Sequence, residues 1–169
     1  LGATDLALAA MTLHIDLVGP RGHHPVEVQR AVRCVEKTAA LKGRFGDNAK
    51  PLLIWHPSRY PEGPEVDDRA VFDGLCQSLG TLCAAAEQQD IYLVVEITRA
   101  GSVGSAETFL HLKDRIGSPA LRVCFDGANF TPDRTPLERA VRMLGPDIVI
   151  AHGKDMWFTD AGEVGGYCA

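Results

Sequence analysis

Short apolar runs alternate along the chain with longer segments in which apolar residues recur every three or four positions. The longer segments are typical of amphipathic helices, and the short runs are typical of strands that are buried on both faces. Turn-favouring residues separate several of these segments, as at Gly117-Ser118-Pro119. The pattern predicts strands at Thr12–Val18, Pro51–Trp55, Ile91–Ile97, Leu121–Phe125 and Asp147–Ala151, and helices at Pro25–Leu41, Val66–Gln89, Ser105–Ile116 and Thr135–Leu144.

The predicted strands and helices alternate, which favours a parallel sheet covered by helices. Two architectures satisfy this order, an open doubly wound sheet and a closed (β/α)8 barrel. A complete barrel usually needs about 250 residues, whereas this chain has 169 residues and five predicted strands. We therefore expect one α/β domain over residues 1–169, which is either a small open sheet or an incomplete (β/α)8 TIM barrel.

Charge and composition exclude several classes of function. The net charge is −5 and the Lys and Arg residues are scattered, so we expect no nucleic-acid partner. The longest apolar runs are too short to span a bilayer, and we expect no membrane partner and no signal peptide. The five cysteines include no CxxC pair. We predict reduced core thiols in a cytoplasmic protein, with a zinc–thiolate site or a catalytic cysteine as the alternative.

Three successive predicted strands end in a residue that can bind a metal ion: Glu96, Asp126 and His152. Parallel strands end at one edge of a sheet and lie about 4.8 Å apart, so these side chains can converge on one cation. Each follows an apolar run, where an unpaired carboxylate is costly and two neighbouring carboxylates repel each other. Such a set suits one divalent metal ion, Mn²⁺, Mg²⁺, Co²⁺ or Zn²⁺. For each residue alone, a helix cap or a solvated turn is the simpler interpretation.

Three segments resemble the xylose-isomerase-like TIM barrel family, which includes sugar phosphate isomerases and epimerases: VVEI, GSPALRVCFDGANF and DIVIAHGKDMWF. The resemblance implies that the chain carries about strands three to seven of the barrel. In that family a Glu, an Asp, a His and a second Glu hold one divalent metal ion, and the first three match Glu96, Asp126 and His152. The second Glu belongs to strand eight, which would lie beyond Ala169. The resemblance therefore implies a longer native protein and an incomplete site in this chain alone.

The resemblance also implies an isomerase or epimerase that acts on a small sugar, sugar phosphate or polyol and is often a homo-oligomer. Such enzymes abstract a proton next to a carbonyl, through an enediolate that the metal ion stabilises. Glu96 would be both a metal ligand and the catalytic base. Asn129, Lys154 and His56 would contact the substrate, although Lys154 could instead be solvated or salt-bridged and His56 could be an ordinary loop residue.

Other functions remain open at this stage. A metal-dependent dehydratase of the inosose or dehydroshikimate type would begin with the same proton abstraction. The chain could also be an inactive partial barrel. An endonuclease-IV-like phosphodiesterase is disfavoured, because Asn129 stands where a His would be expected and the net charge is negative.

Overall fold

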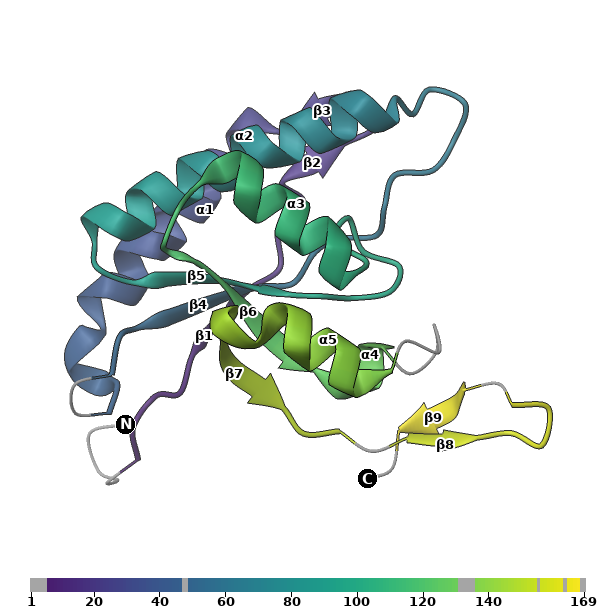
Figure 1. Ribbon diagram of the computed structural model, residues 1–169. Helices are drawn as coiled ribbons and strands as arrows, with labels where there is room; N and C mark the ends of the chain where they lie inside the picture. The colour runs from purple at the N-terminus through teal and green to yellow at the C-terminus, as the bar shows by residue number, and fades with distance from the viewer. Residues whose placement is uncertain (1–5, 47–48, 131–135, 155, 163, 168–169) are drawn as a thin grey trace.

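A sheet of five parallel strands forms the centre of the molecule (Figure 1). The computed structural model describes residues 6–46, 49–130, 136–154, 156–162 and 164–167. Neighbouring strands in the sheet follow the order β1-β4-β5-β6-β7, and every pair is parallel. Each strand therefore lies beside the next one along the chain, as in a barrel wall. The strands are β1 (Met11–Leu13), β4 (Leu52–Trp55), β5 (Tyr92–Glu96), β6 (Leu121–Asp126) and β7 (Ile148–His152).

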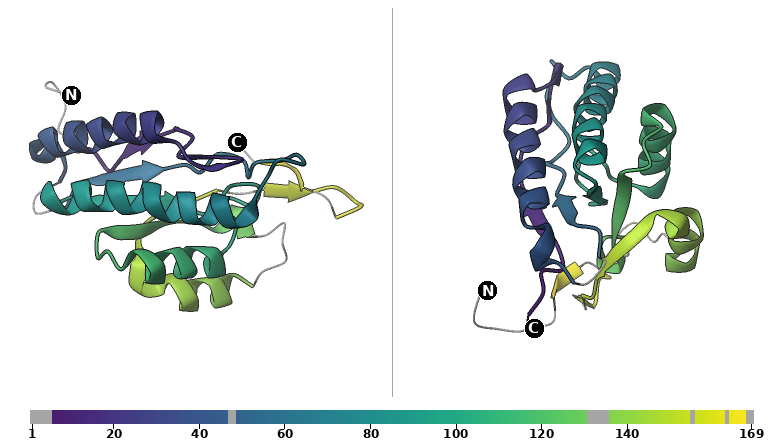
Figure 2. Two further views of the ribbon diagram at one scale, coloured as in Figure 1. Left: turned by 90° about the horizontal axis from the view of Figure 1, so that it is seen from above. Right: turned by 90° about the vertical axis from the view of Figure 1, so that its left-hand side faces the viewer.

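The four long helices all cover the same face of this sheet (Figures 1 and 2). Alternate strand residues such as Leu53, Leu93 and Val123 point to that face and join the main hydrophobic core with the helices. Each fully buried Leu or Val contributes about 1.5–3 kcal/mol of hydrophobic stabilisation. No helix in the described ranges is long and apolar enough to cross a membrane. The helices are α1 (Pro25–Ala40), α2 (Asp68–Gln88), α3 (Ala106–Ile116) and α5 (Leu137–Leu144).

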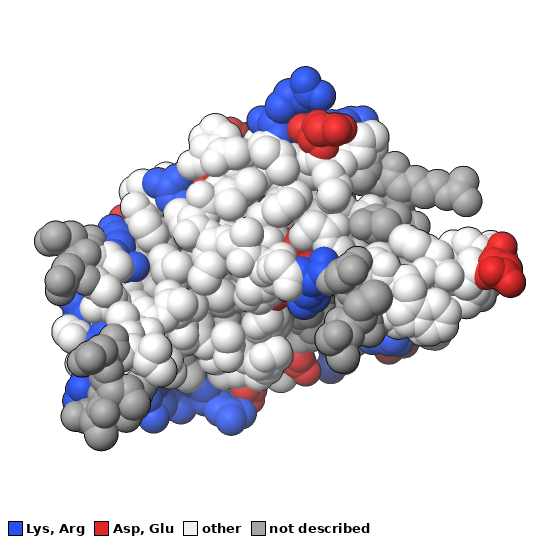
Figure 3. Space-filling view, turned by 90° about the horizontal axis from the view of Figure 1, so that it is seen from below, with Lys and Arg blue, Asp and Glu red and all other residues white. Residues whose placement is uncertain are grey.

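The opposite, inner face of the sheet carries a second and smaller apolar cluster. Ile54, Val94 and Cys124 are buried at its centre. The sheet curves around this face, and no described helix lies on it (Figure 2). Seen from below, the molecule shows a broad area without charged side chains, bordered by Lys and Arg (Figure 3). A doubly wound sheet has helices on both faces, so the structure is the other predicted architecture, an incomplete (β/α)8 barrel.

Local signals in the sequence fix the ends of the helices. Asp67 caps α2, because its carboxylate accepts hydrogen bonds from the backbone amides of Arg69 and Ala70 in the first turn. Ser105 caps α3 by accepting from the amide of Thr108. Gly117 ends α3 with a φ of +68°, a left-handed conformation that favours glycine. These signals place the turns that lead into β5, β6 and their polar ends.

The prediction of one strand at Thr12–Val18 is wrong for its second half. The sheet strand β1 ends at Leu13, and β2 (Val18–Gly19) pairs antiparallel with β3 (Gly22–His23) in a separate hairpin. The hairpin turns at Pro20 and Arg21, β3 begins at Gly22, where φ is +100°, and the hairpin packs directly on α2. A Cβ on Gly74 of α2 would lie 2.3 Å from the amide nitrogen of His23, so this close contact requires glycine.

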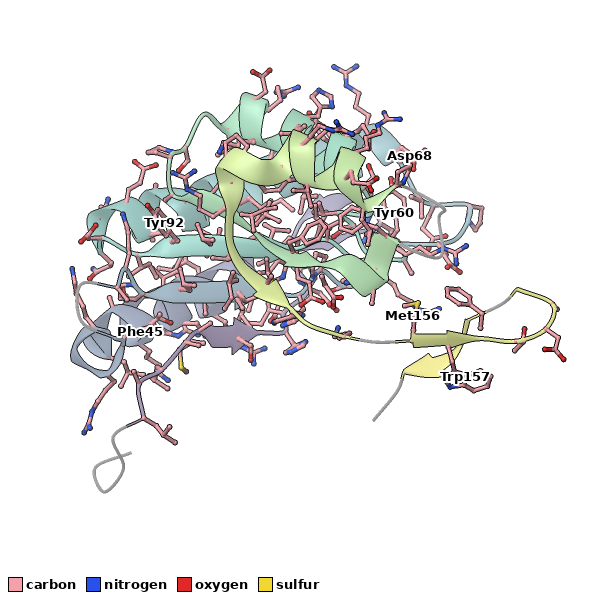
Figure 4. All side chains as sticks on the ribbon, turned by 60° about the horizontal axis from the view of Figure 1, so that its bottom comes forward. Phe45, Tyr60, Asp68, Tyr92, Met156 and Trp157 are labelled. Carbon is pink, nitrogen blue, oxygen red and sulfur yellow. The ribbon has the colours of Figure 1, made fainter. Side chains whose placement is uncertain are left out.

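The Gly-rich tail, for which the sequence predicts no element, contains a second hairpin. It consists of β8 (Met156–Phe158) and β9 (Val164–Tyr167), which pair antiparallel and extend beyond the carboxyl edge of the sheet (Figure 1). Trp157 lies on β8 with β9 beside it (Figure 4). Its indole ring occupies the space in which a Cβ on Gly165 would stand, at 2.2 Å. The glycine is therefore required by the aromatic ring on the opposite strand.

The other predicted strands and helices are confirmed, with ends that shift by at most two residues. A helix at Thr135–Leu144 is found as α5, although Thr135 itself lies outside the described residues. A four-residue helix that the pattern did not predict, α4 (Gly127–Phe130), follows β6 directly. It brings Asn129 back towards the end of β5.

Candidate metal centre

Three neighbouring strands end in the predicted ligands at the carboxyl edge of the sheet. Glu96 is the last residue of β5, Asp126 of β6 and His152 of β7. Asp126 and His152 are direct partners in the register, and Glu96 is paired with Cys124. Side chains alternate between the two faces of a strand. Glu96 and Asp126 therefore lie one step above the apolar cluster of the inner face, which explains why two carboxylates are buried there.

The Glu96 carboxylate is the most heavily contacted group of this edge. The side chain is only 4% exposed. Its Oε2 lies 2.8 Å from Nδ1 of His56 and 3.2 Å from Nδ1 of His152. Its Oε1 accepts a hydrogen bond of 3.2 Å from the side-chain amide of Asn129, which also donates to the carbonyl of Ile97. These contacts hold Glu96 in one orientation at the mouth of the incomplete barrel.

Asp126 is fully buried and faces the same space. Its Oδ1 accepts a hydrogen bond of 3.1 Å from the amide of Ala128, which fixes the carboxylate at the start of α4. Its Oδ2 lies 3.9 Å from Nδ1 of His152 and is in close contact with the ammonium group of Lys154. The same ammonium lies 3.8 Å from Oε1 of Glu96. Lys154 therefore supplies a positive charge between the two carboxylates.

Two carboxylate oxygens at this centre nevertheless have no hydrogen bond from the described part of the chain. They are Oε2 of Glu96 and Oδ2 of Asp126, and both are buried. The imidazole nitrogens beside Oε2 are close but are not aligned to donate a hydrogen bond to it. Buried oxygens of this kind cost free energy unless a cation or a donor satisfies them. The residues present fit a divalent cation held by Glu96 and His152, whose ligand atoms lie within 4.8 Å of each other, with Asp126 3.9 Å from His152 and paired with the Lys154 ammonium until a cation replaces it.

His56 follows β4, and its surroundings favour the neutral imidazole. Burial lowers the pKa of His56 below its ordinary value, Glu96 opposes this by raising the pKa, and His14, His152 and Lys154 lower it further. The ring stacks on His14 with centroids 4.3 Å apart and planes only 3° from parallel. A neutral imidazole can donate from one nitrogen and accept at the other. His56 can therefore hydrogen-bond a polar ligand at this mouth.

Cys124 is the group at this centre that sequence reasoning did not assign to it. The side chain is fully buried, and one ligand atom each from Glu96, Cys124 and His152 all lie within 4.8 Å of one another. Burial, followed by the charges of Glu96 and Asp126, raises the pKa of the Cys124 thiol to about 12. The signal was present in the sequence, since Cys124 precedes Asp126 by two residues and must share its face of β6.

The structure brings all six predicted site residues to one edge of the sheet. Glu96, Asp126, His152, Lys154 and His56 approach one another within a few ångströms. Asn129 reaches the same place from α4, where its amide is already engaged with Glu96. Asn129 thus orients a carboxylate in this structure, and a direct contact between its side chain and a substrate stays a prediction.

The model of one protein family, the xylose isomerase-like TIM barrel, matches residues 1–165 of the chain. The chain belongs to this family. Comparison with curated proteins gave no match. The five parallel strands of this xylose isomerase-like chain are therefore part of a TIM barrel.

Solved structures of the same fold resemble this xylose isomerase-like chain at low sequence identity. AsbF, a probable 3-DHS dehydratase from Bacillus anthracis, is 12% identical with a TM-score of 0.72, over 89% of this chain and 51% of that chain. The IolI protein with a bound zinc atom is 15% identical with a TM-score of 0.67, over 90% of this chain and 53% of that chain. A D-allulose 3-epimerase from Methylomonas sp. is 15% identical with a TM-score of 0.66, over 91% of this chain and 55% of that chain. The chain spans about half the length of these relatives, and the likeness shows the fold alone.

Proposed function

We propose that this chain carries the metal-binding and proton-transferring groups of a divalent-metal-dependent sugar or sugar-phosphate isomerase or epimerase. The observation that carries the proposal is the pair of buried carboxylates beside His152, each with an oxygen that lacks a hydrogen bond in the described structure. The family and the names of the similar structures, which include an epimerase and a zinc-containing protein, support it.

In this proposal Glu96, Asp126 and His152 hold the cation. When bound, a divalent cation polarises the substrate carbonyl and makes the neighbouring C–H bond more acidic. Oε2 of Glu96 lies beside His152 on the ligand side, which leaves Oε1 to take the proton from that carbon. The hydrogen bond from Asn129 to Oε1 orients this oxygen and tempers its basicity. The burial of Glu96 keeps water away from the transferred proton.

Lys154 and His56 are placed to bind the oxygen atoms of a substrate. The Lys154 ammonium already lies next to both carboxylates, so a hydroxyl or phosphate oxygen at the mouth would meet a donor there. His56 presents an imidazole beside Glu96, and burial lowers the pKa of this imidazole. Sugars, sugar phosphates and polyols offer hydroxyl groups of this kind, and we expect a substrate from these classes.

The test is the exchange of the carbon-bound proton in D2O, followed by NMR on a panel of ketoses, ketose phosphates and inososes with Mn²⁺ or Zn²⁺ present. We expect Glu96→Gln to lower the exchange rate about 10²–10⁴-fold, the usual contribution of a general base. Glu36→Gln, which changes an exposed glutamate of α1, should leave the rate unchanged. Exchange that persists in Glu96→Gln would remove Glu96 as the base.

A dehydratase is the second candidate, because Lys154 supplies an acid close to the proposed base. Its ammonium lies 3.8 Å from Oε1 of Glu96 and could protonate a leaving hydroxyl. The similarity to AsbF is compatible with this reaction. Product analysis of the same panel separates the two reactions, since an epimerase conserves the mass of its substrate and a dehydratase lowers it by one water. An inactive partial barrel would bind no metal ion and exchange no proton.

We further propose that residues 1–169 act as one domain, since a single sheet joins β1 to β7. A cytoplasmic location is supported by the four free cysteines of the described chain. Homo-oligomers stay a prediction that light scattering of the purified protein would test.

A further inference from the structure

The buried Cys124 thiol belongs to the candidate metal centre but has no role in the proposed reaction. It lies on β6, on the same face as Asp126 and directly opposite Glu96 in the register. Its neighbours below are the apolar side chains of the inner cluster, which include Ile54 and Val94. As a core residue it would simply fill space. Its position directly under the ligands permits a second role.

The distances at this centre suit coordination by sulfur. In a tetrahedral zinc site with Zn–N and Zn–O bonds of about 2.0–2.2 Å and a Zn–S bond of about 2.3 Å, ligand atoms lie about 3.3–3.6 Å apart. Oε2 of Glu96 and Nδ1 of His152 are already 3.2 Å apart. The Cys124 sulfur lies within 4.8 Å of ligand atoms on both. These three ligand atoms would have to approach one another by about 1 Å to reach such distances. Asp126 lies outside this group, with Oδ2 3.9 Å from Nδ1 of His152, and would join as the fourth ligand.

An independent observation indicates that a cation belongs beside this thiol. Oε2 of Glu96 is buried and accepts no hydrogen bond from the described residues. It is the Glu96 oxygen nearest to His152. A cation at this oxygen would therefore stand within reach of the sulfur. The chain would then offer four protein ligands without any residue beyond Ala169.

We propose that Cys124 binds the cation as a thiolate, as a fourth protein ligand beside Glu96, Asp126 and His152, and that it makes the site selective for Zn²⁺ or Co²⁺ over Mg²⁺ and Mn²⁺. This inference rests on the metal site of the proposed function. Thiolate is a soft ligand that Mg²⁺ does not favour, whereas Zn²⁺ and Co²⁺ accept it readily. The S–H bond breaks as the S–Zn bond forms, and the proton passes to solvent.

The test is X-ray absorption at the zinc edge of the full chain loaded with one Zn²⁺. A Cys168→Ser background removes the thiol that lies outside the described residues. We expect one sulfur at about 2.3 Å from zinc, which is absent in the variant that also carries Cys124→Ser. Cys83→Ser in the same background is the matched control, because Cys83 is an equally buried thiol on α2 and should leave the sulfur signal unchanged.

Affinity measurements give a second reading that does not depend on activity. We expect Cys124→Ser to weaken Zn²⁺ binding at least about 100-fold, the upper end of what loss of an outer-sphere partner costs, and to change Mg²⁺ binding by less than about threefold. Circular dichroism of the Cys124→Ser variant checks that it folds. If it does not fold, the zinc-edge spectrum of the protein that keeps Cys124 still tests the inference.

The outcomes separate this inference from the proposed function. Zinc that binds through nitrogen and oxygen alone, with Glu96→Gln weakening it, would overturn the role of Cys124 and leave the proposed metal site in place. No binding of Zn²⁺, Co²⁺, Mn²⁺ or Mg²⁺ would overturn both. Sulfur coordination that survives Cys124→Ser would also refute the assignment.

Discussion

The charge of Lys154 stabilises the two carboxylates in the metal-free protein and should therefore oppose metal binding. Its ammonium contacts Asp126 and lies 3.8 Å from Oε1 of Glu96. A divalent cation would need Oδ2 of Asp126 and would repel the ammonium, so Lys154 must give up its contact with Asp126 when the cation binds. The substitution Lys154→Met removes the charge and keeps most of the side-chain volume.

The size of the effect can be worked out from the attraction between the Lys154 ammonium and the Glu96 carboxylate. At an effective dielectric constant of about 20, charges separated by the 3.8 Å between Lys154 and Glu96 attract by about 4 kcal/mol. The lysine side chain is 37% exposed, and screening and side-chain ordering reduce the net value to about 1–2 kcal/mol. We expect Lys154→Met to destabilise the metal-free protein by this amount. Since each 1.4 kcal/mol is tenfold in affinity, it should tighten the binding of Zn²⁺ about 5–30-fold.

The assay is a competition titration with a chelator at fixed ionic strength, together with urea unfolding of the metal-free protein. Lys50→Met is the control, because it removes one equal charge from an ion pair with Asp90, far along the strand from Glu96. It should destabilise the protein slightly and leave the affinity for Zn²⁺ within about twofold, as expected for an exposed pair. Affinity that is unchanged or weaker in Lys154→Met would refute the competition between ammonium and metal.

Two further predictions concern local structure. Gly165→Ala should displace the Trp157 indole, because the new Cβ would lie 2.2 Å from the ring. Tryptophan emission should shift in this variant and not in Gly153→Ala, where no atom lies within 4 Å; identical spectra would contradict the contact. Hydrogen bonds from two lysine ammonium groups lower the pKa of Asp90 from 3.8 to about 2. Its contribution to the free energy of unfolding should be present above pH 3.8 and disappear as the pH falls towards 2, so Asp90→Asn should flatten the pH dependence in that window, as measured by urea unfolding.

Most of the sheet could be predicted because its strands are apolar on both faces and the helices between them are strongly periodic. The same reasoning found Glu96, Asp126 and His152, since a polar residue at the end of an apolar run is visible in one sequence. The choice between an open sheet and a barrel was not visible in the periodic pattern and came from the resemblance to the barrel family. It depends on which face each helix covers, and the helical pattern is equally apolar on its inward side in both architectures.

The errors and omissions come from contacts between distant segments. The strand predicted over Thr12–Val18 breaks after Leu13 because its end, Val18, belongs to a hairpin with β3 that packs on α2 through Gly22 and Gly74. Asn129 reaches Glu96 because α4 begins directly after β6. Neither the hairpin nor this helix leaves a periodic signal, since each is shorter than the window in which periodicity can be recognised.

The alternation of side chains along the strands explains why the candidate metal site lies directly next to a buried apolar cluster. Four polar residues at the carboxyl edge each stand two positions after an apolar or thiol residue of the inner cluster. Removing water from beneath the carboxylates strengthens every charge interaction at the mouth. It also makes buried carboxylate oxygens without a hydrogen bond costly, so their charge must be balanced by Lys154 or by a bound metal ion. The pairs are Ile54 with His56, Val94 with Glu96, Cys124 with Asp126 and Ile150 with His152. Of these four pairs, only Cys124 with Asp126 has a potential metal ligand in the inner cluster. A sulfur signal from Cys124 would therefore show that the cation lies close to the inner cluster.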